Sequence, residues 1–271
     1  MTEEKNITYT IGYIGVIDVL GFGEFTKDED NFHRIYSLMN HIFYQKRNFE
    51  RNFEHIKFSV LSDTVVVMVK ATDPQKFDYV FFESVLSHIG LVRTFILNCT
   101  GLYSRVGITF GKYYYDEKTT GTIFGPAITK AVKLAEKSDE FIKTDPRFKN
   151  RPAAILIDEV FSKKEKNPYY QYFLEGCVTD WLSNIRVKQI QNTNYYIYNP
   201  YFEAFQDYLY TGRNVDNYSD EMFFEMFCKR EKQRLKEQIE SAGKDIAEKY
   251  SIESELLNDF ISNYPKTGPL Y

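Results

Sequence analysis

A single carboxylate, Asp18, interrupts an apolar run of sequence over residues 11–20 (IGYIGVIDVL). The run is short and rich in β-branched residues, which predicts a strand buried on both faces. Burying an ionised carboxylate without a partner is costly, so a group in this position is usually paired, metal-bound or protonated. Gly21 and Gly23 follow directly, and glycines after a strand let backbone amides approach phosphate oxygens. Asp18 therefore either holds a metal ion beside a phosphate or accepts backbone N–H groups at the strand end.

A second carboxylate, Asp63, lies in a tight connection between two predicted strands, residues 56–61 and 64–69. Asp is common in turns for local hydrogen-bonding reasons alone. If the strand that carries Asp18 lies beside this hairpin, however, its end meets the turn and the two carboxylates can share divalent ions. Mg²⁺ needs few protein carboxylates where a triphosphate supplies the other oxygens. Two such ions stabilise both the attacking and the leaving oxygen of a phosphoryl transfer.

A third segment begins with R-V-G-I-T-F-G from Arg105 to Gly111 and continues into a predicted helix over residues 126–138. Lys130, Lys133 and Lys137 share one face of that helix by their spacing, so they can meet a triphosphate. The alternative is the solvated face of an amphipathic helix.

Hydrophobic periodicity over the first 199 residues predicts the order β-α-β-β-α-β-α-β followed by a hairpin. The remaining expected elements are helices over residues 28–51 and 74–98 and strands over 103–111, 153–157, 185–190 and 195–198. This order predicts an α+β domain with helices packed on one sheet. We place the catalytic domain at residues 1–199 and a helical C-terminal extension at 200–271, where a charged helix is expected over 221–242. Phe223, Phe224 and Phe227 on that helix predict docking onto the domain or onto a second subunit.

Composition excludes several classes of function. With 43% hydrophobic residues the 271-residue chain can bury a sizeable core, and its net charge of −4 argues against a general nucleic-acid binder. Three cysteines without metal-ligand spacing fit a reducing cytosol. A polar N-terminus and the absence of an apolar stretch near ~20 residues predict a cytoplasmic protein with neither secretory signal nor membrane span. The P-loop and serine-hydrolase motifs do not occur.

Taken in order, the three segments resemble the catalytic domain of class III nucleotidyl cyclases. The resemblance rests on the following residues: Asp18, Gly21, Phe22, Ser62, Asp63, Arg105, Gly107, Ile108, Gly111, Gly125, Ala127, Ala131 and Glu136. It implies a ferredoxin-like βαββαβ core sheet with helices on one face, and conversion of a nucleoside triphosphate to its 3′,5′-cyclic monophosphate. It also implies two Mn²⁺ or Mg²⁺ ions per site, held by Asp18, Asp63 and the backbone of Val19. The backbone from Val19 through Gly21 and Phe22 to Gly23 would meet the phosphates.

The base- and ribose-reading positions depart from those of the purine cyclases. Thr129 and Lys133 stand where the family has Asn and Arg, and lysine offers a point charge in place of a planar fork. Ser59, with Lys57 on the same strand face, and Thr122 occupy the positions that read a purine. These departures resemble the bacterial pyrimidine cyclases of the Pycsar anti-phage systems. That resemblance implies UTP or CTP as substrate and a cyclic product that acts on a separate effector.

The same resemblance implies a head-to-tail homodimer with active sites at the interface. One subunit would supply Asp18, Asp63 and residues 19–23, and the other would supply Thr129 and Lys133. Arg105 either donates to a pyrimidine carbonyl or pairs within the fold. Two other functions stay open: an adenylate or guanylate cyclase with a divergent pocket, and a catalytically degenerate domain that binds a nucleotide or a partner.

Overall fold

The computed structural model describes residues 8–73, 78–116, 122–136, 155–158, 187–189, 196–199, 201, 205, 208, 220–241, 254 and 256–262. The first part of the chain forms β1 (Thr10–Val19), α1 (Phe22–Phe25), the 3₁₀ turn η1 (Glu29–Asn31), α2 (Phe32–Asn52), β2 (Ile56–Leu61), β3 (Thr64–Lys70), α3 (Tyr79–Thr100) and β4 (Ser104–Asp116). It is followed by β5 (Thr122–Phe124), α4 (Pro126–Glu136), β6 (Ile155–Ile157), β7 (Val187–Gln189), β8 (Tyr196–Tyr198) and α9 (Asp220–Ser241).

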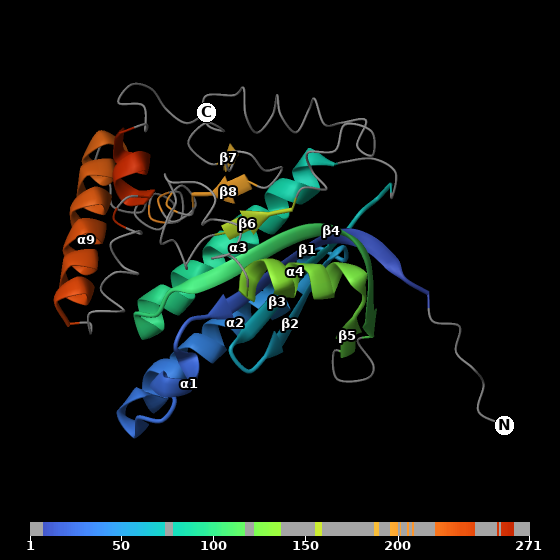
Figure 1. Ribbon diagram of the computed structural model, residues 1–271, viewed down its shortest axis with the longest axis horizontal. Coiled ribbons are helices and arrows are strands. Elements are labelled where there is room, and N and C mark those ends of the chain that lie inside the picture. The colour runs from blue at the N-terminus through green and yellow to red at the C-terminus, as the bar shows by residue number, and fades with distance from the viewer. Residues whose placement is uncertain are drawn as a thin grey trace.

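One sheet organises these elements, in the strand order β2-β3-β1-β4-β6-β8-β7, and β5 pairs with β4 (Figure 1). β1 is the antiparallel neighbour of both β3 and β4, whereas β4 and β6 run parallel. The predicted α+β class and the βαββαβ core are confirmed. The predicted late hairpin is confirmed as the antiparallel pair β7 and β8.

Alternate residues of β1 face two different hydrophobic cores. Tyr13 and Ile17 pack with residues of α2 and α3, and Ile14 and Val16 pack with residues of α4. Successive side chains of a strand point to opposite faces, so α2 and α3 lie together on one face of the sheet, as predicted for the core. α4 crosses the other face (Figure 1).

Two glycines of β4 let α4 approach that face closely. A Cβ atom built on Gly107 would lie 2.1 Å from the carbonyl oxygen of Ala131, whereas one on Gly111 would lie 3.4 Å from the Cβ of Ala127. The glycines and alanines of the cyclase-like motif are therefore the contact surface between β4 and α4. The turn before α4 also requires glycine, because Gly125 has a φ of +133° and its Cβ would meet the backbone of Tyr113 at 2.9 Å.

The C-terminal helices pack on the sheet domain through an aromatic cluster. Phe223 and Phe227 of α9 are buried together with Phe205 and Phe260, and the cluster includes Tyr103 from the segment before β4. The aromatics of α9 therefore dock onto the domain of the same chain, the first of the two expected partners, and Figure 1 shows α9 at one side of the molecule. The division at residue 199 stays a prediction. None of the described helices is both long and apolar enough to cross a membrane.

Besides the unforeseen strand β5, three elements differ from the expectation. The strand that was expected over residues 103–111 continues to Asp116, where it pairs with the short strand β5. The helix expected from residue 28 begins at Phe32, after η1, whose Asp28 side chain accepts the backbone N–H of Asp30. The four-residue helix α1 was not foreseen, because one turn is too short to show helical periodicity.

His88 of α3 is expected to make the fold sensitive to mild acid. Its ring is buried against Phe49, with centroids 4.1 Å apart, and Nδ1 hydrogen-bonds the carbonyl oxygen of Ser84. Burial lowers the pKa of His88 from 6.5, so the unfolded chain takes up a proton more readily than the folded one. The free energy of unfolding should therefore fall as the pH drops below 6.5, by up to about 1.4 kcal/mol per pH unit.

Urea unfolding at pH 7, 6 and 5 measures this effect. The His88→Gln variant should lose less stability between pH 7 and pH 5 than the wild type does. The matched variant His33→Gln, at an exposed position of α2, should keep the wild-type pH dependence. Equal slopes for wild type and His88→Gln would contradict the prediction.

Candidate active site

The end of β1 meets the turn between β2 and β3, as the sequence predicts. Asp18 lies opposite Thr64 in the β1–β3 register, and the backbone N–H of Val19 donates to the carbonyl oxygen of Asp63 at 3.2 Å. Ser62, with a φ of 56°, adopts the left-handed conformation that reverses the chain within two residues. The two carboxyl-bearing residues are thus held at adjoining strand ends by backbone hydrogen bonds.

Asp18 is paired with an arginine on its other side. Arg105 lies opposite Asp18 in the β1–β4 register, and its Nε and Nη2 donate to Oδ2 of Asp18 at 3.1 and 2.5 Å. Its third nitrogen, Nη1, donates to the carbonyl oxygen of Glu136 at 3.1 Å. Both side chains are about one-fifth exposed, at 22% for Asp18 and 23% for Arg105. Arg105 therefore pairs within the fold, the second of its two expected roles, and compensates the charge of Asp18.

The sheet register brings four of the predicted site residues to one face. Across the strands, Ser59 lies opposite Val66, Val66 opposite Val16, and Val16 opposite Gly107. Side chains two residues along a strand lie on the same face. Lys57 is therefore next to Ser59 on that face, and the pair Asp18 and Arg105 is next to Val16 and Gly107. Ser59 is 6% exposed, and two strand spacings of about 4.8 Å put its strand roughly 10 Å from β1.

The predicted residues of α4 and β5 point to solvent. Thr129 and Lys133 are exposed on α4, one helical turn apart, and Thr129 Oγ1 donates to the carbonyl oxygen of Gly125 at 3.2 Å. Thr122 is exposed on β5. Within the described residues, no hydrogen bond or ion pair joins Thr129 or Lys133 to Asp18 or Asp63. The candidate site of one chain is therefore made by β1, the β2–β3 hairpin and β4.

A buried carboxylate that the sequence analysis missed lies beside this face. Asp158, fully buried after β6, donates its backbone N–H to the carbonyl oxygen of Ile108 at 2.8 Å. Its carboxylate accepts a short hydrogen bond from Thr109 Oγ1 and pairs with Lys130 Nζ at 2.8 Å. The signal was available, because Asp158 follows the apolar run AAILI as Asp18 follows the apolar run IGYIGVI.

The ion pair with Asp158 changes the interpretation of the lysines on α4. Lys130 was grouped with Lys133 and Lys137 as a set facing a triphosphate. Lys130 instead compensates Asp158 within the fold. Lys137 lies outside the described residues, which leaves the exposed Lys133 as the described lysine of this set that faces away from the sheet.

The oxygen donors of Asp18, Asp63 and the Val19 carbonyl suit hard divalent ions that take most of their ligands from substrate and water. Among the described residues there is no cluster of three or more His, Cys, Asp or Glu side chains. Two carboxylates and a strand-end carbonyl are hard oxygen donors, which favour Mg²⁺ or Mn²⁺ over zinc. Such a set fits a site in which substrate phosphates and water complete the coordination.

Comparison with known proteins gives matches to solved structures. No protein-family model matches the sequence, and no curated protein does either. One similar structure is the guanylyl cyclase domain of the RhoGC fusion protein from the aquatic fungus Blastocladiella emersonii, with 11% identity over 70% of this chain and 95% of that one and a TM-score of 0.45. Another is the guanylyl cyclase Cya2, with 14% identity over 72% of this chain and 94% of that one and a TM-score of 0.42.

A third similar structure is the guanylate cyclase domain of RhGC from Catenaria anguillulae in complex with GTP. It is 11% identical over 70% of this chain and 96% of that one, with a TM-score of 0.43.

Proposed function

We propose that this chain is a nucleotidyl cyclase that converts a nucleoside triphosphate to its 3′,5′-cyclic monophosphate and pyrophosphate. The observation that carries the proposal is the junction of β1 with the β2–β3 turn, where the N–H of Val19 bonds the carbonyl of Asp63. It supports assigning Asp18 and Asp63 to one metal site. Lys57 and Ser59 on the face of Asp18 supply polar groups for the rest of the nucleotide, and Arg105 holds the carboxylate of Asp18 in place.

In this proposal Asp18, Asp63 and the carbonyl of Val19 hold two Mg²⁺ or Mn²⁺ ions. Bound ions of this kind lower the pKa of a coordinated hydroxyl and neutralise a leaving pyrophosphate. The chain itself positions the triphosphate. Gly21, at a φ of 74°, is the N-cap of α1, and the first N–H groups of a helix have no acceptor within it. We therefore assign the backbone of Gly21, Phe22 and Gly23 to the phosphates, next to the metal-holding carbonyl of Val19.

The proposed enzyme is a head-to-tail homodimer. Thr129 and Lys133 are exposed on α4, as they must be to reach the site of a second subunit. There Lys133 would place its charge on the phosphates during the in-line attack of the 3′-hydroxyl, and Thr129 would orient the ribose. The tether of Arg105 to Glu136 links the end of α4 to the strand that carries Asp18, so the partner-facing helix and the metal site of one chain are braced together.

We further propose a pyrimidine triphosphate, UTP or CTP, as substrate, and an anti-phage signal acting on a separate effector as the role of the product. The support is chemical: Ser59 offers a hydroxyl where purine cyclases carry Lys or Glu, and Thr122 offers one where they carry Asp or Cys. Ser59 is buried, so a base at this position meets a small polar group within an apolar wall. Thr122 lies on the short strand β5, beside α4.

The pairing of Asp18 with Arg105 is the observation that favours a second candidate, a degenerate domain that binds nucleotide without cyclising it. An arginine that holds the carboxylate competes with a metal ion for the same oxygen. A divergent purine cyclase is the other alternative. These three functions differ in product, so a direct assay separates them.

Purified protein incubated separately with ATP, GTP, CTP and UTP plus Mn²⁺ is expected to form a cyclic pyrimidine monophosphate, identified by mass spectrometry. Omission of the metal should abolish the product. A cyclic purine product would replace the pyrimidine assignment with the divergent purine cyclase. Complete absence of product from all four triphosphates would favour the binding domain.

A further inference from the structure

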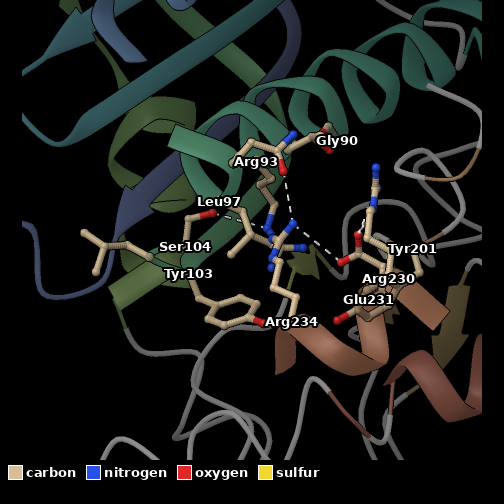
Figure 2. Close-up of a pocket in the computed structure, with 12 residues that line it drawn as sticks. Gly90, Arg93, Leu97, Tyr103, Ser104, Tyr201, Arg230, Glu231 and Arg234 are labelled. Carbon is tan, nitrogen blue, oxygen red and sulfur yellow. Dashed lines mark hydrogen bonds and ion pairs between the residues drawn. The ribbon is translucent and has the colours of Figure 1, made fainter. Parts of the chain in front are cut away.

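A small pocket lies between α3, the start of β4 and α9, outside the residues assigned to the nucleotide (Figure 2). Its volume is about 40 Å³, room for a few water molecules. Sites for drug-sized ligands are ~300 Å³ or more, so a nucleotide does not fit. Figure 2 shows the side chains of Arg93 and Arg234 approaching each other across the pocket, from α3 and α9.

The described residues that line the pocket carry more positive than negative charge. Three arginines, Arg93, Arg230 and Arg234, face one carboxylate, Glu231. Glu231 is 4% exposed, and Arg230 engages its Oε1 through Nε at 3.0 Å and Nη2 at 2.9 Å. Arg234 Nη1 is 3.6 Å from the other carboxylate oxygen. Arg230 thus takes most of this carboxylate, and Arg93 and Arg234 add two further positive charges to the described lining.

The guanidinium of Arg234 is incompletely hydrogen-bonded. Nη1 donates to Asn98 Oδ1 at 3.0 Å. Nε and Nη2 are buried, and in the part of the chain that the structure describes neither has a hydrogen-bond partner. A buried donor without an acceptor is costly, so native proteins usually supply one, from water or from a ligand. Arginine nitrogens match the spacing of oxyanion oxygens, and the resulting charge-assisted bonds are strong.

We propose that this pocket binds a small tetrahedral oxyanion, inorganic phosphate or the like, between Arg93 and Arg234. Its size admits such an ion, its excess positive charge attracts one, and the buried donors of Arg234 need an acceptor. The ion joins α9 to α3, because each helix supplies one arginine. It thereby secures the C-terminal helices on the sheet domain, beside the aromatic cluster that packs there.

The pocket is also joined to the end of β1. Arg93 Nε donates to Ser104 Oγ at 3.2 Å, and Ser104 lies opposite Val19 in the β1–β4 register. The carbonyl of the adjacent Tyr103 accepts the N–H of Leu20 at 2.8 Å. An oxyanion that fixes Arg93 therefore stiffens the segment that follows Asp18. An effect of this stiffening on catalysis rests on the proposed function, whereas the binding of the oxyanion does not.

Thermal unfolding of the full chain, with phosphate titrated against chloride at constant ionic strength, tests the binding without any assay of activity. The wild type should show a saturable rise in Tm, roughly 5 °C or more once phosphate exceeds its Kd about 100-fold. Arg234→Gln should lose most of that rise. Lys236→Gln, a matched change at an exposed position of α9, should keep it.

A second variant, expected to strengthen phosphate binding, keeps the test valid if Arg234→Gln fails to fold. Glu231→Gln removes the competing carboxylate, so half of the phosphate effect should be reached at a lower phosphate concentration than in the wild type. No phosphate-dependent rise in the wild type would overturn the proposal. A rise that persists undiminished in Arg234→Gln, or that acetate reproduces in full, would overturn it too, since these outcomes indicate general salt stabilisation or carboxylate binding.

Discussion

Asp18→Asn is expected to slow cyclic nucleotide formation by at least about 10³-fold, because the loss of a metal-binding carboxylate removes several kcal/mol of transition-state stabilisation. The fold should survive the change. Asparagine keeps the shape of the side chain, and its Oδ1 can still accept hydrogen bonds from Arg105, which holds Oδ2 of Asp18 through Nε and Nη2. The measurement is the initial rate of product formation with Mn²⁺, on protein whose unfolding midpoint has been checked.

Asp63→Asn should behave in the same way, since the two residues adjoin at the strand ends. The matched control is Asp30→Asn, at an exposed position of the 3₁₀ turn η1, which should keep wild-type activity. Wild-type rates in both Asp18→Asn and Asp63→Asn would end the two-metal hypothesis. Loss of activity in the Asp18 variant alone would show that Asp63 is a turn residue, the alternative that its position between two strands left open.

The strands and the turn around the candidate site could be predicted from the sequence because each is encoded by a short stretch of consecutive residues. The apolar run that ends at Asp18, the 56–61 strand and the turn at Ser62 and Asp63 are each visible within a ten-residue window, and the structure has them all. β5 was missed because three residues, Thr122–Phe124, are too few to show a period and are stabilised by pairing with β4.

The partners of the charged residues were beyond local patterns, because they depend on which strands pair and in which register. Arg105 meets Asp18 because β4 is the antiparallel neighbour of β1; 87 residues of sequence separate the two. Lys130 meets Asp158 by the same kind of long-range placement. Helical spacing grouped Lys130 with Lys133, but it contains no information about a carboxylate that arrives from another strand and pairs with Lys130 alone.

Gly107→Ala should be among the most destabilising single-methyl changes in the described sheet. The added Cβ would lie 2.1 Å from the carbonyl oxygen of Ala131, 2.7 Å from the Cβ of Leu134 and 2.8 Å from the backbone nitrogen of Ala135. None of these atoms can rotate away, so α4 must move as a body. Overpacking of this kind typically costs 1–3 kcal/mol, and we expect the upper end, about 3 kcal/mol or more, in urea unfolding.

Gly111→Ala provides the matched control, on the same strand and the same face. Its Cβ would lie 3.4 Å from the Cβ of Ala127, an ordinary contact, so stability should change by less than about 1 kcal/mol.

The two glycine variants also test the proposed role of α4 in catalysis. In the proposed dimer α4 presents Thr129 and Lys133 to the partner, so shifting the helix should lower activity in Gly107→Ala even where the protein remains folded. Equal stability of the two variants would show that α4 does not depend on close contact with β4. Reduced activity in folded Gly107→Ala, with Gly111→Ala active, would show that the close approach of α4 to β4 at Gly107 is needed for catalysis in the opposite subunit.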